Sequence, residues 1–225
     1  MNRPDPTPQF VKTTAFDRPA YGDGLPRMGR ALLDWHAWLT ATTTEGARGE
    51  PIGPRRALRA QLKRCRTPGD ALFLPGFVRI VDFLYPDAAT RAAALADRGT
   101  VAALARVAIL AAPVDREAPA RNRDKSLAWH MLGPAAQIDN DAVKDAEVSS
   151  LRAWRLVRTA DPDAALGVWQ RLLPVFQHNG VNLPQLAQAV AHWNDETRRA
   201  LSFAYFAVAA TGPHPATSGS DAAAA

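Results

Sequence analysis

Apolar residues recur at three- and four-residue steps through most of the chain, which is the spacing of amphipathic α-helices. The clearest stripe follows Asp161-Pro162, a typical helix start with an N-cap aspartate and a proline in the first turn. Its members are Leu166, Trp169, Leu173 and Phe176. Gly180 is expected to end this helix as a C-cap residue.

The same reasoning predicts about eight helices and no strands. We expect helices at about 27–41, 54–66, 71–84, 87–97, 100–112, 161–179, 184–193 and 194–210. Pro75 and Gly76 are expected to kink or delay the third of these helices. No run alternates with period two, and no Asn-Gly or Asp-Gly turn joins two β-branched runs. The predicted class is therefore all-α, a helical bundle.

Breaker residues set the limits of the helical domain. Residues 1–26 hold five prolines and two glycines, which predicts a disordered head, and residues 211–225 read as a flexible tail. The domain between them, 27–210, forms one bundle or two sub-bundles, 27–112 and 140–210.

Composition places the chain in a broad class. The formal net charge of +5 is compatible with a polyanionic partner without requiring one. A single cysteine, Cys65, excludes an intramolecular disulfide and favours a reducing compartment, which we expect to be the cytoplasm. The longest apolar stretch, 101–112, is interrupted by Arg106 and is too short to span a bilayer. No membrane association is expected.

Residues that could support catalysis are scattered. The five histidines form no metal-binding pair, and one cysteine cannot build a thiolate site. Phosphate-binding and nucleophile-elbow motifs are absent from the sequence. The acidic pair Asp139 and Asp141 is expected in a polar loop, where solvation explains it. We therefore predict no catalytic residue, no metal site, no cofactor and no small-molecule substrate.

The helix expected after Pro54 carries a basic face. Leu58, Leu62 and Cys65 occupy the arc toward the core. The helix contains no acidic residue, and like charges three and four residues apart repel each other, so this face predicts an external counter-charge, most commonly phosphate. A merely solvated face, or an acidic protein partner, remains an alternative. The basic residues are Arg55, Arg56, Arg59, Lys63, Arg64 and Arg66, all but Arg64 within an arc of roughly 100°.

A second basic cluster lies near the C-terminus. Arg152, Arg155 and Arg158 recur every three residues beside an expected core stripe of Leu151, Trp154 and Val157. Arg198 and Arg199 stand at the start of the last helix, where a positive charge opposes the helix dipole. We therefore expect these two arginines to have a role other than stabilising the helix. The tryptophans expected on apolar core faces are Trp35, Trp154, Trp169 and Trp193.

In these two regions the sequence resembles the CasB family, the small subunit of the type I-E CRISPR Cascade complex. The first block is Arg55-Arg56-Ala57-Leu58-Arg59 followed by Thr67 to Pro75. The second runs from Leu151 to Phe206 and includes Trp169 with Arg171, Gly180-Val181, the 186–193 helix, and Arg198 before Tyr205-Phe206. Together the two blocks cover somewhat under half of the chain.

The resemblance implies a non-catalytic, all-helical subunit that acts in antiviral defence. It would be present in two copies, packed against the backbone and large subunits of Cascade. Its basic surface would help to hold crRNA, target DNA and the displaced non-target strand, independently of sequence, and so stabilise the R-loop. By position, the resemblance carries over Arg55, Arg59, Arg152, Arg171 and Arg198 as phosphate contacts. The full expected set is Arg55, Arg56, Arg59, Lys63, Arg66, Arg152, Arg155, Arg158, Arg171, Arg198 and Arg199.

Two further functions remain open on the sequence. A free-standing helical DNA-binding regulator would need polar side chains that read bases, and the arginine helix offers only Gln61. A helical adaptor would use the same basic face to bind an acidic protein. A small acid–base enzyme has the least support.

Overall fold

The computed structural model describes residues 8–10, 26–41, 52–115, 117–118, 125–139 and 142–211. Most of the predicted disordered head, residues 42–51 and the tail beyond Thr211 lie outside these residues. The first half contains α1 (Arg27–Thr40), α2 (Ile52–Arg64), α3 (Pro68–Ala71), α4 (Pro75–Leu84), α5 (Ala88–Ala96) and α6 (Arg98–Ala111). The second half contains α7 (Leu127–Leu132), β1 (Gln137–Asp139), β2 (Ala142–Lys144), α8 (Ser150–Arg158), α9 (Pro162–Phe176), the 3₁₀ turn η3 (Gln177–Asn179), α10 (Leu183–Ala191) and α11 (Asp195–Thr211).

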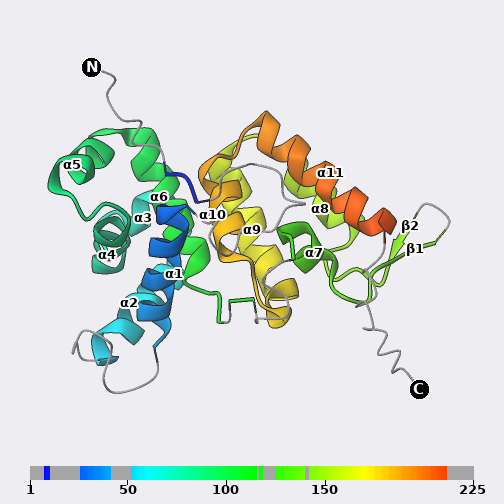
Figure 1. Cartoon of the computed structure of the whole chain (residues 1–225), viewed down its shortest axis with the longest axis horizontal. Helices are drawn as coiled ribbons and strands as arrows, with labels where there is room; N and C mark the ends of the chain where they lie inside the picture. The colour runs from blue at the N-terminus through cyan, green and yellow to red at the C-terminus, as the bar shows by residue number, and fades with distance from the viewer. Residues whose placement is uncertain are drawn as a thin grey trace, which may run out of the picture.

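The all-α class is confirmed, with more helices than predicted. Figure 1 shows α1 to α6 gathered in one half of the molecule and α7 to α11 in the other. The two halves meet where α6 packs against α10 and α9, and α1 also contacts α10. One continuous cluster of buried apolar side chains runs through both halves. In the part of the chain that the structure describes, no helix is both long and apolar enough to cross a membrane.

Side-chain caps fix where several helices begin. The carboxylate of Asp161 accepts a hydrogen bond from the backbone N–H of Ala164 at 2.7 Å, which confirms the predicted start of α9. Asn194 caps α11 in the same way, through the N–H of Thr197 at 2.9 Å. Gly180 ends the 3₁₀ turn after α9 with a φ of 83°, a left-handed conformation that favours glycine.

The helix predicted at 71–84 is two helices. Thr67 and Asp70 form a capping box at the N-terminus of α3, which is a single turn. Pro75, which has no N–H to donate, begins α4 as its first residue. Gly76 lies so close to α2 that an added Cβ would be 2.9 Å from Cδ1 of Leu62. The break therefore lets α4 pack tightly against α2.

The prediction that the chain has no strands is wrong at one place. β1 and β2 pair antiparallel, with Ile138 opposite Val143 and Asp139 opposite Ala142. Asp139 thus ends a strand, where a polar loop was predicted. Three residues are too few to show a period-two pattern in the sequence, which explains why the strands were missed.

Residues 8–10 pack against the second half of the domain, which differs from the disorder predicted for them. Phe10 is fully buried, and its N–H donates to Oε1 of Gln188 at 2.8 Å. The His192 imidazole lies 2.6 Å from the carbonyl oxygen of Pro8 through Nε2. The proline-rich composition of the head gave no sign of this single anchoring aromatic.

We predict that Phe10→Ala destabilises the fold by about 3–5 kcal/mol, because it removes a fully buried aromatic side chain. The matched control is Phe73→Ala, since Phe73 is 92% exposed and its removal leaves no cavity. Urea unfolding monitored by circular dichroism measures both. Equal stability of the Phe10→Ala variant and the wild type would contradict the packing of this segment.

Candidate nucleic-acid interface

Arg55, the first of the predicted phosphate contacts, is buried. The residue is 2% exposed, and its guanidinium carbon lies 5.1 Å from the centroid of the Trp38 ring on α1. Arg55 belongs to α2, which packs against both α1 and α4, so one side of the predicted basic arc faces protein. This position differs from the expectation, because a guanidinium inside the fold cannot reach a phosphate without local unfolding.

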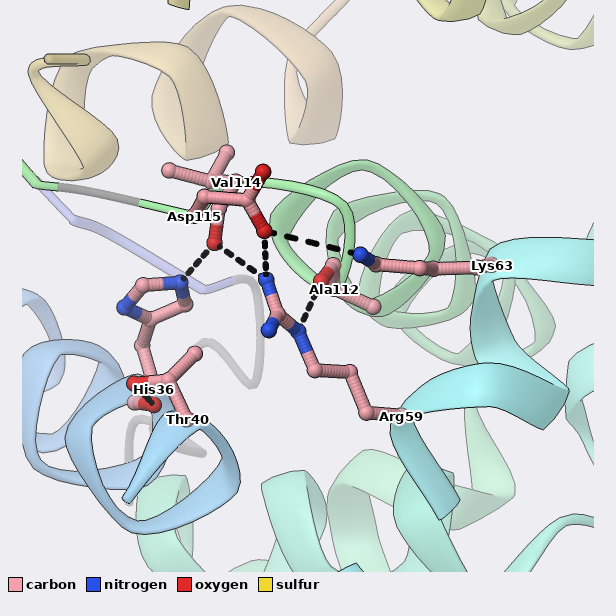
Figure 2. A network of polar contacts seen from close by, with 7 residues as sticks. All are labelled: His36, Thr40, Arg59, Lys63, Ala112, Val114 and Asp115. Atoms are coloured by element: carbon pink, nitrogen blue, oxygen red, sulfur yellow. Dashed lines mark hydrogen bonds and ion pairs between the residues drawn. The ribbon is translucent and has the colours of Figure 1, made fainter. Parts of the chain in front are cut away.

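Arg59 is engaged by the end of α6 (Figure 2). Its Nε donates to the carbonyl of Ala112 at 2.8 Å, and its Nη2 donates to the carbonyl of Val114 at 3.0 Å. The same Nη2 pairs with Oδ1 of Asp115 at 2.6 Å. These carbonyls follow the C-terminus of α6, where a cation also complements the helix dipole. Arg59 therefore caps α6 and joins it to α2.

The network extends to a lysine and a histidine. Nζ of Lys63 lies 3.6 Å from the same oxygen of Asp115. His36, on α1, is 4% exposed, and its Nε2 lies 2.9 Å from the Val114 carbonyl, so Nε2 carries a proton that it donates. Two helices, α1 and α2, thus converge on the four-residue segment 112–115 at the end of α6.

The two acid–base groups of the network respond differently to their surroundings. Burial lowers the pKa of His36 below its usual 6.5, and the Arg59 charge adds to this effect. Partial burial acts to raise the pKa of Asp115, but the Arg59 hydrogen bond and the Lys63 and Arg59 charges outweigh it, so this pKa is lowered. The network is therefore built for a neutral His36 and a charged Asp115.

The prediction that the α2 face lacks a counter-charge is wrong for Arg59 and Lys63. Their partner, Asp115, lies 56 residues beyond Arg59 in the sequence, so inspection of the helix alone could not reveal it. The basic residues of this region that stay exposed without a described ion-pair partner are Arg56, Arg64 and Arg66.

The arginines of α8 are arranged differently. Arg152, Arg155 and Arg158 are all exposed, while Ala153 and Leu156 on the same helix are buried. None of the three guanidiniums forms an ion pair with another described residue. We call these three residues together with the exposed Arg199 of α11 the α8–α11 patch.

The core stripe predicted for α8 is wrong in part. Leu151 is 76% exposed and Trp154 is 49% exposed, although both were expected in the core. Ala153 and Leu156 are buried in their place. A small alanine contributes little to a pattern of large apolar residues, so the pattern predicted the wrong buried face for this short helix. The other tryptophans predicted in the core, Trp35, Trp169 and Trp193, are buried.

Arg198 and Arg171 take two further positions. Arg198 donates from Nη1 to the carbonyl of Val157 at 2.9 Å and pairs with Asp195, so it ties α11 to the end of α8. These two contacts explain why Arg198 stands near the start of α11 despite the helix dipole. Arg171 is exposed on α9, next to Gln170, whose amide donates to the carbonyl of Cys65 at 2.8 Å. Arg171 therefore follows a residue that contacts the end of α2.

An open pocket of about 430 Å³ lies between α8 and α11. The ring of Trp154 forms one wall, with its centroid 6.2 Å from that of Phe206. The guanidinium carbon of Arg158 lies 5.8 Å from the Trp154 centroid. The residues that line the pocket are Trp154, Val157, Arg158, Asp195, Arg198, Arg199 and Ser202.

The described side chains offer a cationic surface and no grouped metal ligands. Among them, no three His, Cys, Asp or Glu residues lie close enough to hold a metal ion. The chemistry that this surface supports is the binding of anions by guanidinium groups, whose planar fork suits both phosphate and carboxylate.

We predict that His36 makes the fold less stable in mild acid. Because its pKa is lowered in the folded protein, the unfolded chain takes up a proton first as the pH falls below 6.5, and stability decreases from that point. His36→Gln, which can still donate to Val114, should flatten this dependence by up to about 1.4 kcal/mol per pH unit between pH 7 and 5. Urea unfolding across this range measures the difference, and parallel curves would contradict it.

We also predict that Arg59→Ala costs about 1–3 kcal/mol of stability, since it removes the side-chain donor of the Ala112 carbonyl and one of the two partners of the Val114 carbonyl and of the Asp115 carboxylate. Arg56→Ala is the matched control on the same helix, and its exposed side chain should contribute less than about 0.5 kcal/mol. Thermal and urea unfolding measure both variants. A loss of stability in Arg56→Ala that equals the loss in Arg59→Ala would refute these assignments.

One of the comparisons with known proteins gives a match. Residues 58–206 match the family of the CRISPR-associated protein Cse2. The match begins inside α2, after Arg55 and Arg56, and includes all of α3 to α10 and most of α11. No curated protein and no solved structure matches the chain. Since the matched residues span well over half of the sequence, the chain belongs to the Cse2 family, the CasB small subunits of type I-E Cascade.

Proposed function

We propose that this chain grips the sugar–phosphate backbone of crRNA and of the target and displaced DNA strands, and thereby stabilises the R-loop of a type I-E Cascade complex. The observation that carries the proposal is the α8–α11 patch. Its four arginines, Arg152, Arg155, Arg158 and Arg199, are exposed and have no carboxylate partner among the described residues. Family membership supplies the setting, a Cascade subunit.

The energetics of the R-loop give such contacts their effect. The heteroduplex formed is about as stable as the DNA duplex that it replaces, so backbone contacts made by protein can tip the balance. Each phosphate neutralised by an arginine also releases counterions, which makes the binding dependent on salt and independent of sequence. A subunit that acts in this way needs exposed guanidiniums and no catalytic group.

The proposed contact residues are fewer than the sequence-based set. Arg55 and Arg59 are assigned to the fold, because one is buried and the other caps α6. Lys63 and Arg198 take secondary roles, since each is paired with an aspartate. The residues that we propose to contact phosphate are Arg56, Arg66, Arg152, Arg155, Arg158, Arg171 and Arg199.

We further propose that the chain packs against the backbone and large subunits and against a second copy of itself. Exposed apolar side chains are available to be covered in an assembly. Phe73, between α3 and α4, is 92% exposed, and Val78 on α4 is 53% exposed. Both lie in the half formed by α1 to α6, away from the α8–α11 patch (Figure 1).

We predict that Arg152→Glu/Arg155→Glu weakens binding to DNA and RNA of any sequence and lowers the magnitude of the salt slope by about 1.4–1.8, or about 0.7–0.9 for each phosphate that is no longer neutralised. The matched control is Arg27→Glu/Arg98→Glu, which makes the same charge change at exposed positions on α1 and α6. Fluorescence anisotropy with labelled oligonucleotides across a salt series measures all three proteins.

Three results would count against the proposal. Equal weakening of binding by the control pair would show that net charge, and not the position of the arginines, causes the effect. Strong preference for one DNA sequence would favour a regulator. An absence of binding by the wild type even at low salt would assign the basic surface to an acidic protein partner.

A further inference from the structure

Trp154 stays half exposed, although its ring lies beside Phe206 and the Arg158 guanidinium. Trp35, Trp169 and Trp193 are at most 5% exposed, whereas Trp154 is 49% exposed at the centre of α8. A tryptophan that serves only the fold is normally buried, because its large apolar surface gains most from removal from water. The half-open ring of Trp154 is therefore available to a ligand.

The pocket beside this ring carries excess positive charge. Of its three arginines, Arg198 is paired with Asp195, the only acidic residue of the lining. Arg158 and Arg199 have no ion-pair partner among the residues that the structure describes. An occupant that suits the pocket is therefore anionic and also offers a flat face to an indole ring.

We propose that this pocket binds an unpaired nucleotide, whose base stacks on Trp154 while Arg158 and Arg199 hold its neighbouring phosphates. The inference rests on the proposed function and narrows it, since it assigns this site to single-stranded DNA or RNA. Aromatic rings and arginines in one open groove are the combination by which proteins bind single strands without reading their sequence. The pocket volume of about 430 Å³ lies in the range of small-ligand sites, about 300–1,000 Å³.

A duplex does not meet the same requirements. Bases inside a duplex are stacked on their neighbours on both faces, so neither face is open to an indole ring. Arginines alone can still bind the duplex backbone, through the rest of the α8–α11 patch. Trp154 is therefore expected to contribute to single-strand binding only.

Charge also argues against a second copy of this chain as the occupant. A two-fold symmetric contact would place the same patch against itself, so it would bring the arginines of both copies into one interface. Like charges brought together and removed from water are costly, and interface cores are poor in charged residues. The exposed apolar neighbours Leu151 and Phe203 are compatible with either occupant, so a dimer is kept as an outcome of the test.

The test compares oligo(dT), oligo(U) and a DNA duplex of equal length as probes for the full chain, with anisotropy as the readout. We expect Trp154→Leu to weaken binding of one or both single strands by about 5- to 150-fold, with duplex affinity and salt slopes unchanged. Trp154→Phe should restore most of the lost affinity, since it keeps an aromatic face. The matched control is Phe203→Leu, because Phe203 is 75% exposed on α11 but does not line the pocket.

Photocrosslinking of 5-iodouracil oligonucleotides adds a readout that a merely structural role would not give. The expected crosslink maps by mass spectrometry to the peptide that contains Trp154. Single-strand affinity that survives Trp154→Leu would overturn the stacking proposal and leave the proposed function standing. Equal weakening of single strands and duplex would make Trp154 a structural support, which also overturns it. Loss of a dimer with unchanged nucleic-acid affinity would assign the pocket to a second copy, and a wild type that binds no probe would end both proposals.

Discussion

The packing of α6 in the middle of the molecule is the constraint on which the other elements depend. Every residue of α6 from Ala103 to Ala111 is buried, and four of these nine are alanines, beside which neighbouring helices can approach closely. The helix contacts α10 and α9 on one side and α2, α3, α4 and α5 on the other. Its one buried cation, Arg106, pairs with Asp163 on α9 at 2.9 Å, which adds a polar tie between the two halves.

A helix buried on all sides also buries its end. The carbonyls that follow Ala111 need donors, and the chain supplies them from α1 and α2 through His36 and Arg59. This requirement explains why Arg59, which was expected at a phosphate backbone, serves the fold. In physical terms, a guanidinium near unsatisfied carbonyls and a carboxylate is already bound, and one that stands alone on the surface is available.

Features that depend on neighbouring residues were predictable from the sequence. The all-α class, the capped start of α9 at Asp161 and the burial of Trp169 follow from local spacing and capping chemistry. The pairing of Arg59 with Asp115 and the anchoring of Phe10 on Gln188 depend on contacts 56 and 178 residues apart along the chain. A single sequence holds no signal for either contact.

The helix α8 shows the same limit for the candidate site. Its three exposed arginines were found from their spacing. The buried face of the helix was predicted wrongly, because Ala153 is a core residue that is too small to stand out in the apolar pattern. That error hid the exposed ring of Trp154. In the structure, Arg55 and Arg59 of α2 are committed to the fold, whereas the arginines of α8 and Arg199 of α11 are open to solvent.

The lifetime of an R-loop held by a complete Cascade complex is the measurement that decides whether the exposed arginines do what we propose. The complex would be assembled with this chain, either as the wild type or with Arg152, Arg155, Arg158 and Arg199 changed to alanine, and R-loop dissociation would be followed in real time. The account predicts that the variant is incorporated normally and that its R-loops dissociate several times faster, more so at high salt. Unchanged lifetimes with the variant fully incorporated would contradict it.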